Sequence, residues 1–155
     1  CRQSDIINAA VKTGNIINVK KGQFMAPWDV KNIVEKVADG DGEKLLLTER
    51  GSSFGYNSLV SDMTSIPIMQ GFGVPVIFDA THSVQRPGGL GKTTGGAREF
   101  IPTLAKCAVA AGCNGIFMEV HDNPDNAKSD AASQWPLNKL DTVLNSLKDI
   151  KEVIN

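Results

Sequence analysis

The sequence has little net charge, few cysteines and no long apolar run, and each absence excludes a class of protein. Its 155 residues include 16 basic and 17 acidic side chains, and the net charge of −1 argues against a broad surface for nucleic acid or an acidic membrane. No apolar run approaches the roughly 18 residues that cross a bilayer. Cys1, Cys107 and Cys113 form no CxxC pair, which fits a reducing compartment better than a disulfide scaffold. We interpret Cys107 and Cys113 as small buried residues.

Short apolar segments are predicted to form parallel strands. They occupy residues 16–19, 45–47, 76–78 and 116–118. Their spacing of roughly 30 to 40 residues fits a strand, a loop, a helix and a return loop. None alternates with polar residues, as expected of parallel strands that are buried on both faces. Apolar residues at helical spacing predict helices at residues 6–11, 30–37, 100–111 and 137–150. The predicted class is therefore α/β, a helix followed by four strand–helix units.

Four strand–helix units make half of an eight-stranded TIM barrel. The sequence begins at Cys1 without a methionine and enters a helix at once, and a half-barrel would leave two strand edges unpaired. We therefore expect residues 1–155 to be the C-terminal half of one barrel domain, with strands 5–8 and their flanking helices, whose upstream half is absent. A smaller open α/β sheet is the alternative.

The segment after the third predicted strand holds a dense group of reactive side chains. Asp79, His82, Ser83 and Gln85 come directly after an apolar run, and a glycine-rich loop follows them. Ligands of α/β enzymes bind at the carboxyl ends of strands. We interpret this segment as the edge of an active site.

Basic side chains follow the first two predicted strands. Lys20, Lys21 and Arg50 lie at strand ends, and Arg2 lies at the start of the first helix. A phosphorylated substrate needs such cations, because phosphate accepts several charge-assisted hydrogen bonds and arginine can supply two of them. A surface lysine with a solvated ammonium group is the alternative for Lys21.

A histidine and carboxylate group follows the third and fourth predicted strands. His82, Glu119, His121 and Asp130 suit a divalent first-row metal, although spacing alone does not say which of them are ligands. Glu119 and His121 are two residues apart on a strand, so they should project to the same side. A structural role is the alternative for His121, and Asp79 could orient a neighbouring group. These features predict a barrel enzyme that acts on a phosphorylated metabolite and could hold a metal.

Uncommon strings recur in order along the chain: CRQSD at 1–5, NVKKGQF at 18–24, APW at 26–28, LTERG at 47–51, FGYN at 54–57 and DATHSVQ at 79–85. Together they resemble 3-deoxy-D-manno-octulosonate 8-phosphate synthase. That family is a TIM barrel that condenses phosphoenolpyruvate with D-arabinose 5-phosphate and water, releasing phosphate, in the synthesis of a lipopolysaccharide core sugar. The resemblance implies a cytoplasmic homotetramer with these two small-molecule substrates.

The resemblance also implies roles, position by position. Lys20 and Arg50 match cations that hold phosphoenolpyruvate, and Arg2 matches a further phosphate contact. His82 matches the histidine of the site, and with Lys20 it is the candidate for catalysis. Further substrate contacts are implied in or after the same loops for Gln23, Ser83, Gln85 and Thr94. The family usually has serine at the last of these, and threonine keeps the hydroxyl group.

The family divides into metal-dependent and metal-independent members. The string AKSDAASQ at 127–134 resembles the metal-dependent pattern, where the other class tends to carry Cys-Asp-Gly-Pro. His82, Glu119 and Asp130 then match three of four ligands. The fourth, a cysteine of the first barrel strand, lies upstream, and Cys1 is not that residue. The implied cofactor is a divalent ion, Fe, Zn, Mn or Co, because these ligands do not select among them.

Three alternatives stay open. A heptulosonate-type synthase would use the same barrel with a different aldose phosphate. A Schiff-base aldolase would use Lys20 or Lys21 as its nucleophile. The chain could also be an inactive half-barrel fragment, since the lysine, asparagine and arginine that complete both substrate sites lie upstream.

Overall fold

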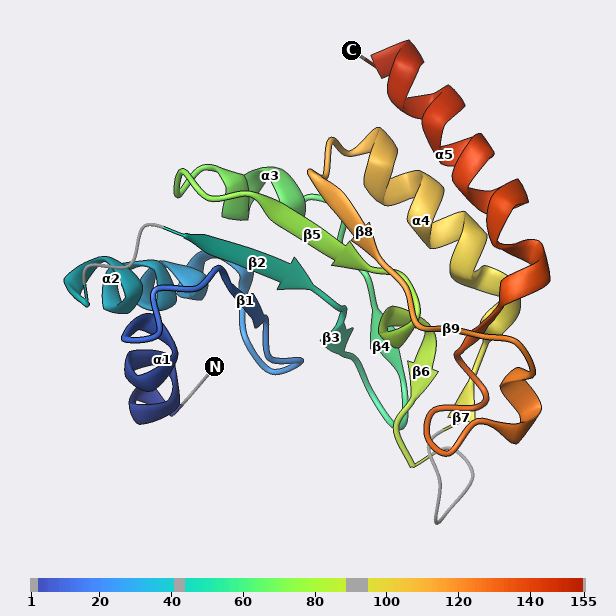
Figure 1. Ribbon diagram of the computed structural model, residues 1–155, viewed down its shortest axis with the longest axis horizontal. Coiled ribbons are helices and arrows are strands. Elements are labelled where there is room, and N and C mark those ends of the chain that lie inside the picture. The colour runs from blue at the N-terminus through green and yellow to red at the C-terminus, as the bar shows by residue number, and fades with distance from the viewer. Residues whose placement is uncertain (1–2, 41–43, 89–94, 155) are drawn as a thin grey trace.

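A parallel sheet forms the centre of the protein (Figure 1). The computed structural model describes residues 3–40, 44–88 and 95–154. Neighbouring strands are parallel, in the order β1-β2-β5-β8. Their bounds are β1 (Ile17–Lys20), β2 (Leu45–Glu49), β5 (Val76–Asp79) and β8 (Gly115–Phe117). The predicted strands and the α/β class are thus confirmed, with strand ends shifted by about two residues at most.

Helices connect successive strands, as strand–helix units require. The predicted helices are α1 (Ser4–Val11), α2 (Lys31–Asp39), α4 (Ile101–Ala110) and α5 (Leu140–Ile154). One-turn segments lead into three of them: η1 (Pro27–Val30), η3 (Arg98–Phe100) and η5 (Leu137–Lys139). The sequence pattern did not reveal α3 (Ser65–Gln70), which links β2 to β5 and is only 6 residues long. A helix this short shows too few turns for its apolar period to be recognised.

One face of the sheet packs against the helices and forms the hydrophobic core. Leu47, Val76 and Phe78 on this face are fully buried. They cluster with apolar residues of the surrounding helices: Val30, Ile33, Val37, Ile66, Met69, Ile101, Ala105 and Ala108. The last helix, α5, packs on α4 (Figure 1). The opposite, inner face is less covered, with Asn18 exposed and Leu46 and Ile77 half-buried.

Short strand pairs extend beyond the carboxyl ends of the main strands (Figure 1). They are β3 (Ser52–Ser53) with β4 (Leu59–Val60), β6 (Gln85–Arg86) with β7 (Gly95–Gly96), and β9 (Val120–His121) with β10 (Trp135–Pro136). Residues 82–84 form the one-turn η2 (His82–Val84) just before β6. These pairs fix the loops that carry the candidate site.

The two cysteines on and after α4 differ in burial. Cys113 is buried as expected, but Cys107 is exposed, so its predicted burial is wrong. The buried stripe of α4 runs through Ile101, Ala105 and Ala108, and each helical step turns by about 100°. Cys107 therefore points away from the sheet.

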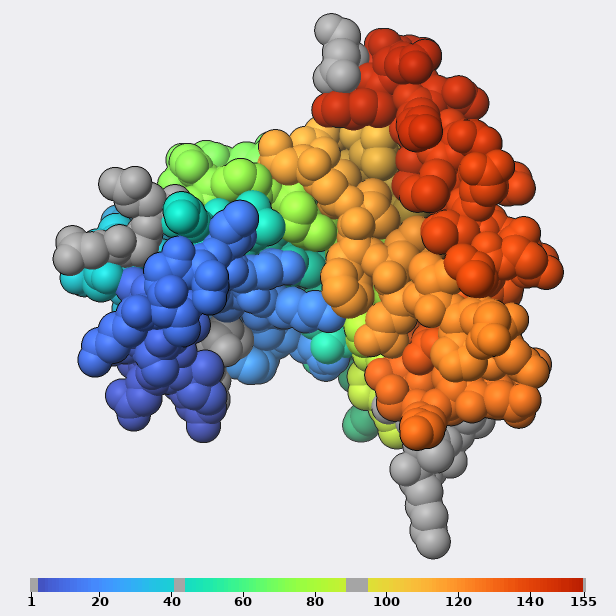
Figure 2. Space-filling view, viewed as in Figure 1, coloured from blue at the N-terminus to red at the C-terminus, as the bar shows by residue number. Residues whose placement is uncertain are grey.

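None of the helices in the described ranges combines the length and apolar character needed to span a bilayer. In the space-filling view, the N-terminal residues (blue) and the residues from β8 onward (orange to red) form the two sides of the molecule. Residues of the middle of the chain (teal to green) are visible between them (Figure 2).

Candidate active site

The functional side chains converge because parallel strands end at the same edge of the sheet. Lys20 closes β1, Arg50 follows β2, Asp79 closes β5 and Glu119 comes two residues after β8. The register pairs Lys20 with Thr48 and Asp79 with Phe117, which places the strand ends at similar heights. Residues separated by up to about a hundred positions in sequence thus meet on the inner face.

Asp79 contacts both Lys20 and His82 at the centre of the site. Its carboxylate is fully buried and accepts hydrogen bonds from Lys20 Nζ at 2.6 Å and from His82 Nδ1 at 2.7 Å. The backbone N–H of His82 donates to the other carboxylate oxygen at 2.9 Å. Lys20 Nζ also lies 4.2 Å from the centre of the Phe117 ring, a favourable cation–π contact. These contacts are those expected if Asp79 orients a neighbouring group, and that role stays a prediction.

The charge state of Asp79 follows from these contacts. Burial alone would raise its pKa, but the hydrogen bonds from His82 and Lys20 outweigh burial and hold the pKa below its ordinary value of 3.8. An ionised carboxylate only accepts hydrogen bonds, so His82 Nδ1 carries a proton. The second ring nitrogen, Nε2, then lies on the side of the ring that faces away from Asp79.

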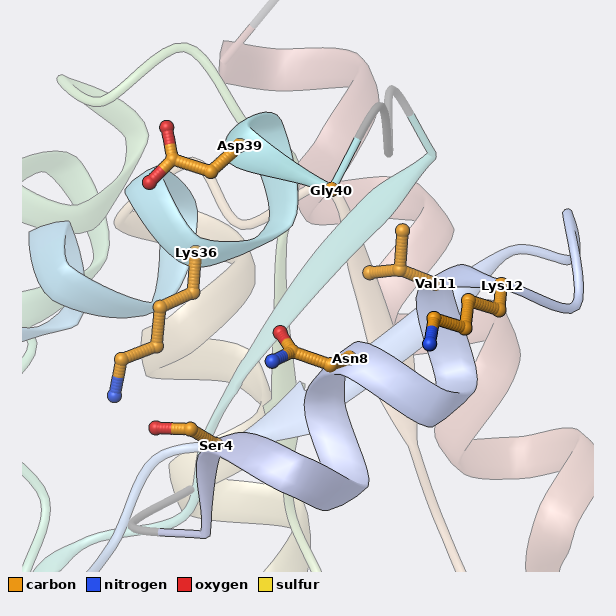
Figure 3. A pocket seen from close by; sticks show the side chains of 7 residues that line it. All are labelled: Ser4, Asn8, Val11, Lys12, Lys36, Asp39 and Gly40. Carbon is orange, nitrogen blue, oxygen red and sulfur yellow. The ribbon is translucent and has the colours of Figure 1, made fainter.

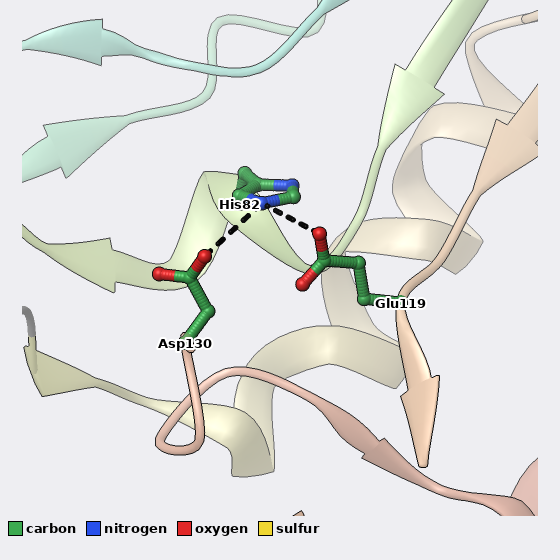
Figure 4. Close-up of side chains that lie close together, drawn as sticks. All are labelled: His82, Glu119 and Asp130. Carbon is green, nitrogen blue, oxygen red and sulfur yellow. Dashed lines mark ion pairs between the residues drawn. The ribbon is translucent and has the colours of Figure 1, made fainter. Parts of the chain in front are cut away.

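Two carboxylates lie near that nitrogen, and with His82 they make three potential metal ligands (Figure 4). His82 Nε2 lies 3.3 Å from Glu119 Oε1 and 3.9 Å from Asp130 Oδ2. One ligand atom from each of the three residues lies within 4.8 Å of the others. A histidine held at Nδ1 by a carboxylate is the usual arrangement behind a metal-bound imidazole. The donor set, one nitrogen and two carboxylate oxygens, fits a divalent first-row ion.

Thr81 supports this group and was missed by the sequence reasoning. Its hydroxyl donates to Asp79 at 3.1 Å and accepts from the backbone N–H of Glu119 at 3.1 Å. It therefore joins the end of β5 to the residue that follows β8. Its position between Asp79 and His82 was the available signal.

Asp130 is held by an unusual backbone conformation. Its φ of 50° is in the left-handed region, which non-glycine residues other than Asn and Asp rarely adopt. Its carbonyl accepts from the backbone N–H groups of Ser133 at 2.8 Å and Gln134 at 3.1 Å. Arg98, from η3, donates to the carbonyl of Ala131 on the same loop. The loop thus presents the Asp130 carboxylate to His82.

Arg50 lies beside the His82 group, at the strand end where the sequence placed it. Its Nη2 donates to the carbonyl of His82 at 3.2 Å and to Gln85 Oε1 at 2.8 Å. Lys20 and Arg50 therefore place two cations next to the potential metal ligands. An anion bound there would meet both charges.

Lys21 points to the opposite face of the sheet, and both sequence interpretations of it are wrong. Its side chain is 1% exposed, so it is not a solvated surface lysine. Its ammonium group donates to two backbone carbonyls and to Ser52 Oγ, and lies 3.6 Å from Glu49. With these donors engaged inside the protein, Lys21 has none to offer a phosphate.

The remaining predicted substrate contacts are spread along the same edge. Gln23 accepts a hydrogen bond from Ser53 at 3.3 Å and, among the described contacts, has none to Lys20 or Arg50. Ser83 is buried, and its hydroxyl donates to the carbonyl of Ala80 at 3.1 Å. Their substrate roles stay predictions. Arg2 and Thr94 lie outside the described residues.

His121 does not join Glu119 at the site. Its Nδ1 accepts from the backbone N–H of Asn123 at 2.9 Å, and the group of potential ligands found in the described ranges leaves it out. The two-residue alternation fails here because the regular strand β8 ends at Phe117, before either residue. The expectation of a shared face was wrong, and the structural alternative for His121 fits its contacts.

A polar groove elsewhere provides a contrast (Figure 3). It has a volume of about 420 Å³ and lies between α1 and α2, lined by Ser4, Asn8, Val11, Lys12, Lys36, Asp39 and Gly40. Figure 3 shows the charged ends of Lys36 and Asp39 pointing away from each other. No hydrogen bond or ion pair joins these lining side chains to one another, all of which belong to the described residues. The groove therefore lacks the connected hydrogen bonds and ion pairs that join the side chains of the His82 group.

Comparisons with known proteins show relatives that match almost the whole chain. The chain is 58% identical over 147 residues to the 2-dehydro-3-deoxyphosphooctonate aldolase of Nitratidesulfovibrio vulgaris (strain DP4), covering 95% of this chain and 54% of that protein. Enzymes with the same name from Protochlamydia amoebophila (strain UWE25) and Brucella ovis (strain ATCC 25840) are 56% identical over 154 residues and 57% identical over 147 residues. These matches cover 99% and 95% of this chain, and 56% and 53% of those proteins.

The chain thus spans about half the length of the curated relatives it matches. Their name is a synonym of the octulosonate-phosphate synthase that the sequence motifs resemble, so the resemblance is confirmed. A family model described as the DAHP synthetase I family matches residues 1–155. The chain belongs to the DAHP synthetase I family.

Proposed function

We propose that this chain is part of a synthase that condenses phosphoenolpyruvate with D-arabinose 5-phosphate and water. The products are 3-deoxy-D-manno-octulosonate 8-phosphate and inorganic phosphate. The observation that carries the proposal is the meeting of Lys20 and Arg50 with His82, Glu119 and Asp130 at one edge of the sheet. The names of the curated relatives support this substrate pair over the heptulosonate-type alternative.

We further propose that the chain forms half of a TIM barrel, the fold of this family. Strands β1 and β8 each have one hydrogen-bonded neighbour in the described sheet. The inner face, with Asn18 exposed and Leu46 and Ile77 half-buried, would be covered by four further strands. Below, "the complete polypeptide" means this chain joined to that upstream half.

In this mechanism the two cations bind and orient phosphoenolpyruvate, which carries both a phosphate and a carboxylate. Lys20 and Arg50 approach the same inner space, so one anion can contact both. Carbon C3 of phosphoenolpyruvate forms a bond to the aldehyde carbon of the sugar phosphate, and water adds at C2. The resulting tetrahedral centre then loses phosphate by C–O cleavage.

His82, Glu119 and Asp130 are the residues that would hold a divalent metal, with a fourth ligand from upstream. Such an ion would supply Lewis-acid chemistry to an oxygen of the aldehyde or of the attacking water. Asp79 keeps the proton of His82 on Nδ1, which directs Nε2 toward the two carboxylates. In a metal-independent enzyme, His82 would keep only a role in contacting the substrates.

A product assay tests the reaction. The complete polypeptide is incubated with phosphoenolpyruvate and either arabinose 5-phosphate or erythrose 4-phosphate, while phosphate release and product mass are measured. We expect the eight-carbon product from arabinose 5-phosphate. Faster turnover of erythrose 4-phosphate would instead support the heptulosonate-type reaction. Running the 155-residue chain alone in the same assay tests the inactive-fragment alternative, because we expect no turnover without the upstream residues.

The metal requirement has its own test. Exhaustive chelation should abolish turnover by the complete polypeptide, and Mn(II), Co(II), Zn(II) or Fe(II) should restore it. Asp130→Ala should lower metal content measured by elemental analysis while leaving the far-UV spectrum unchanged, because Asp130 lies on a loop. Full turnover by metal-free protein would assign the chain to the metal-independent class.

The Schiff-base alternative is less favoured by the geometry. A nucleophilic lysine needs a free lone pair, whereas Lys20 is bonded to Asp79 at 2.6 Å as an ion pair and Lys21 is buried with its donors engaged. Borohydride treatment in the presence of substrate should therefore leave no covalent adduct detectable by mass spectrometry.

We also propose a homotetramer in the cytoplasm, which light scattering and cell fractionation of the complete polypeptide would test.

A further inference from the structure

The side chain of Gln85 joins the proposed anion-binding group to the proposed metal-binding group. Arg50 Nη2 donates to Gln85 Oε1 at 2.8 Å, and Gln85 Nε2 donates to Asp130 Oδ1 at 2.7 Å. Gln85 is only 9% exposed. One amide thus connects the residue after β2 to the loop after β9.

Chemistry fixes the direction of this amide. A guanidinium group only donates hydrogen bonds, and a carboxylate only accepts them. The amide oxygen must therefore face Arg50, and the amide nitrogen must face Asp130. A flipped amide would break both contacts at once, so the two are made or lost together.

The backbone on both sides of the amide is firmly held. Gln85 lies in β6 and pairs with Gly96 of β7, and its neighbour Val84 accepts a hydrogen bond from Ala97 at 3.0 Å. Gly96 leaves no room for a side chain, because a Cβ there would lie 2.7 Å from the carbonyl oxygen of Ala132, in the Asp130 loop. The hairpin that carries Gln85 is therefore packed against the loop that carries Asp130.

We propose that Gln85 is a positioning residue that sets both Arg50 and Asp130, and that it acts through them instead of by contact with substrate. The inference rests on the proposed function for the identity of the bound anion and cation. A residue that only touched the sugar phosphate would affect one affinity. Gln85 must affect the affinities for the metal and for the anion together.

The test measures both affinities without turnover, in the complete polypeptide. Binding of Mn(II) to metal-free protein and binding of phosphoenolpyruvate to metal-free protein are followed by calorimetry. Gln85→Met, which has similar size and no amide, should weaken each by about tenfold or more, the usual effect of losing a residue that supports a metal ligand. Gln85→Asn keeps the amide, but its side chain is too short to reach both partners, so both affinities should fall in the same way. If Gln85→Met fails to fold, Gln85→Asn tests the positioning role in its place.

Gln70 offers a matched control. Its amide also bridges two groups, donating to the carbonyl of Gly112 at 2.8 Å and to Asn114 Oδ1 at 2.9 Å, away from the His82 group. Gln70→Met should lower the melting temperature and leave both affinities unchanged. In protein that already carries Asp130→Ala, Gln85→Met should have no further effect on Mn(II) binding, because the contact to Asp130 is already gone.

The outcomes separate this inference from the proposed function. If Gln85→Met binds Mn(II) and phosphoenolpyruvate like the wild type, or loses only one of them, the positioning role is overturned even where the wild type makes the expected product. If both affinities fall while the wild type makes no octulosonate product, the positioning role stands and the proposed reaction fails.

Discussion

Consecutive lysines at the end of β1 form ion pairs on opposite faces of the sheet. On the inner face, Lys20 contacts Asp79 at 2.6 Å and keeps 38% of its side chain exposed. On the outer face, Lys21 lies 3.6 Å from Glu49, and both side chains are at most 2% exposed. The two pairs have the same chemistry and differ in what surrounds them.

The surroundings decide what each pair can do. Lys20 borders His82 Nδ1 at 3.4 Å and has an exposed side from which an anion can approach. Lys21 instead joins the loop after β1 to the short strand β3, since it donates to Met25 O and Ser52 Oγ and faces Glu49. Glu49 in turn accepts from the backbone N–H groups of Arg50 at 3.0 Å and Gly51 at 2.6 Å. We therefore assign a binding role to the inner pair as part of the proposed function, and we expect the outer pair to contribute mainly to stability.

The largest effect should come from breaking the outer pair. Lys21→Met leaves the Glu49 carboxylate buried without its counter-ion, which typically costs about 3 to 5 kcal/mol of unfolding free energy. In the complete polypeptide, urea unfolding should show this loss. Adding Glu49→Gln removes the stranded charge and keeps an acceptor for the Arg50 and Gly51 amides, so the double variant should recover part of the stability.

Lys31 supplies the control for that experiment. It lies 3.5 Å from Glu35, almost the same separation as in the buried pair, but both side chains are more than half exposed. Lys31→Met should change the unfolding free energy by about 0.5 kcal/mol or less, as is usual for exposed pairs. Equal losses for the two variants would show that burial does not distinguish them.

The next largest effect should be on activity, at the inner face. Arg50→Ala should lower kcat/KM for phosphoenolpyruvate by about two to three orders of magnitude, because a charge-assisted contact to a bound anion is worth on the order of 3 kcal/mol. Steady-state kinetics of the complete polypeptide provide the measurement, with Lys31→Met as the control. Kinetics within a few-fold of the wild type would remove Arg50 from the site.

Much of this site could be predicted from the sequence, and the failures have physical causes. Residue type alone gave His82, Glu119, His121 and Asp130 as candidates. The family resemblance selected His82, Glu119 and Asp130, and the structure brings these three together. Residue type alone did not separate Lys20 from Lys21, because which of them points to the inner face depends on how the strand is placed in the sheet. His121 was misplaced because β8 ends before it.

Contacts that cross between loops were also beyond the sequence. The amide of Gln85 meets Arg50 and Asp130 only because two loops, distant in sequence, pack together. The left-handed backbone of Asp130 has no signature in the residues around it. Side-chain chemistry is thus readable from the sequence, whereas its direction and its partners are set by packing.

A smaller effect is expected for the two cysteines on and after α4, which also differ in burial. Burial raises the pKa of the Cys113 thiol, so less of the reactive thiolate forms, and access to it is blocked. Cys107 is exposed on α4. Iodoacetamide at pH 8 should therefore label Cys107 at least about ten times faster than Cys113. Peptide mass spectrometry of the folded complete polypeptide measures the ratio, and equal rates would contradict the burial of Cys113.

The smallest effect should come from the groove between α1 and α2. Its charged side chains are neither buried nor joined to one another, so we expect no binding or catalytic role for them. Lys36 lies in the last turn of α2, where a positive charge favours the helix by a few tenths of a kcal/mol. Lys36→Ala should therefore change the unfolding free energy by about 0.5 kcal/mol or less and leave kcat/KM within about twofold.

Lys148→Ala, on the exposed side of α5, is the control. A tenfold loss of activity for Lys36→Ala alone would mean that this groove, despite its unconnected charges, takes part in function.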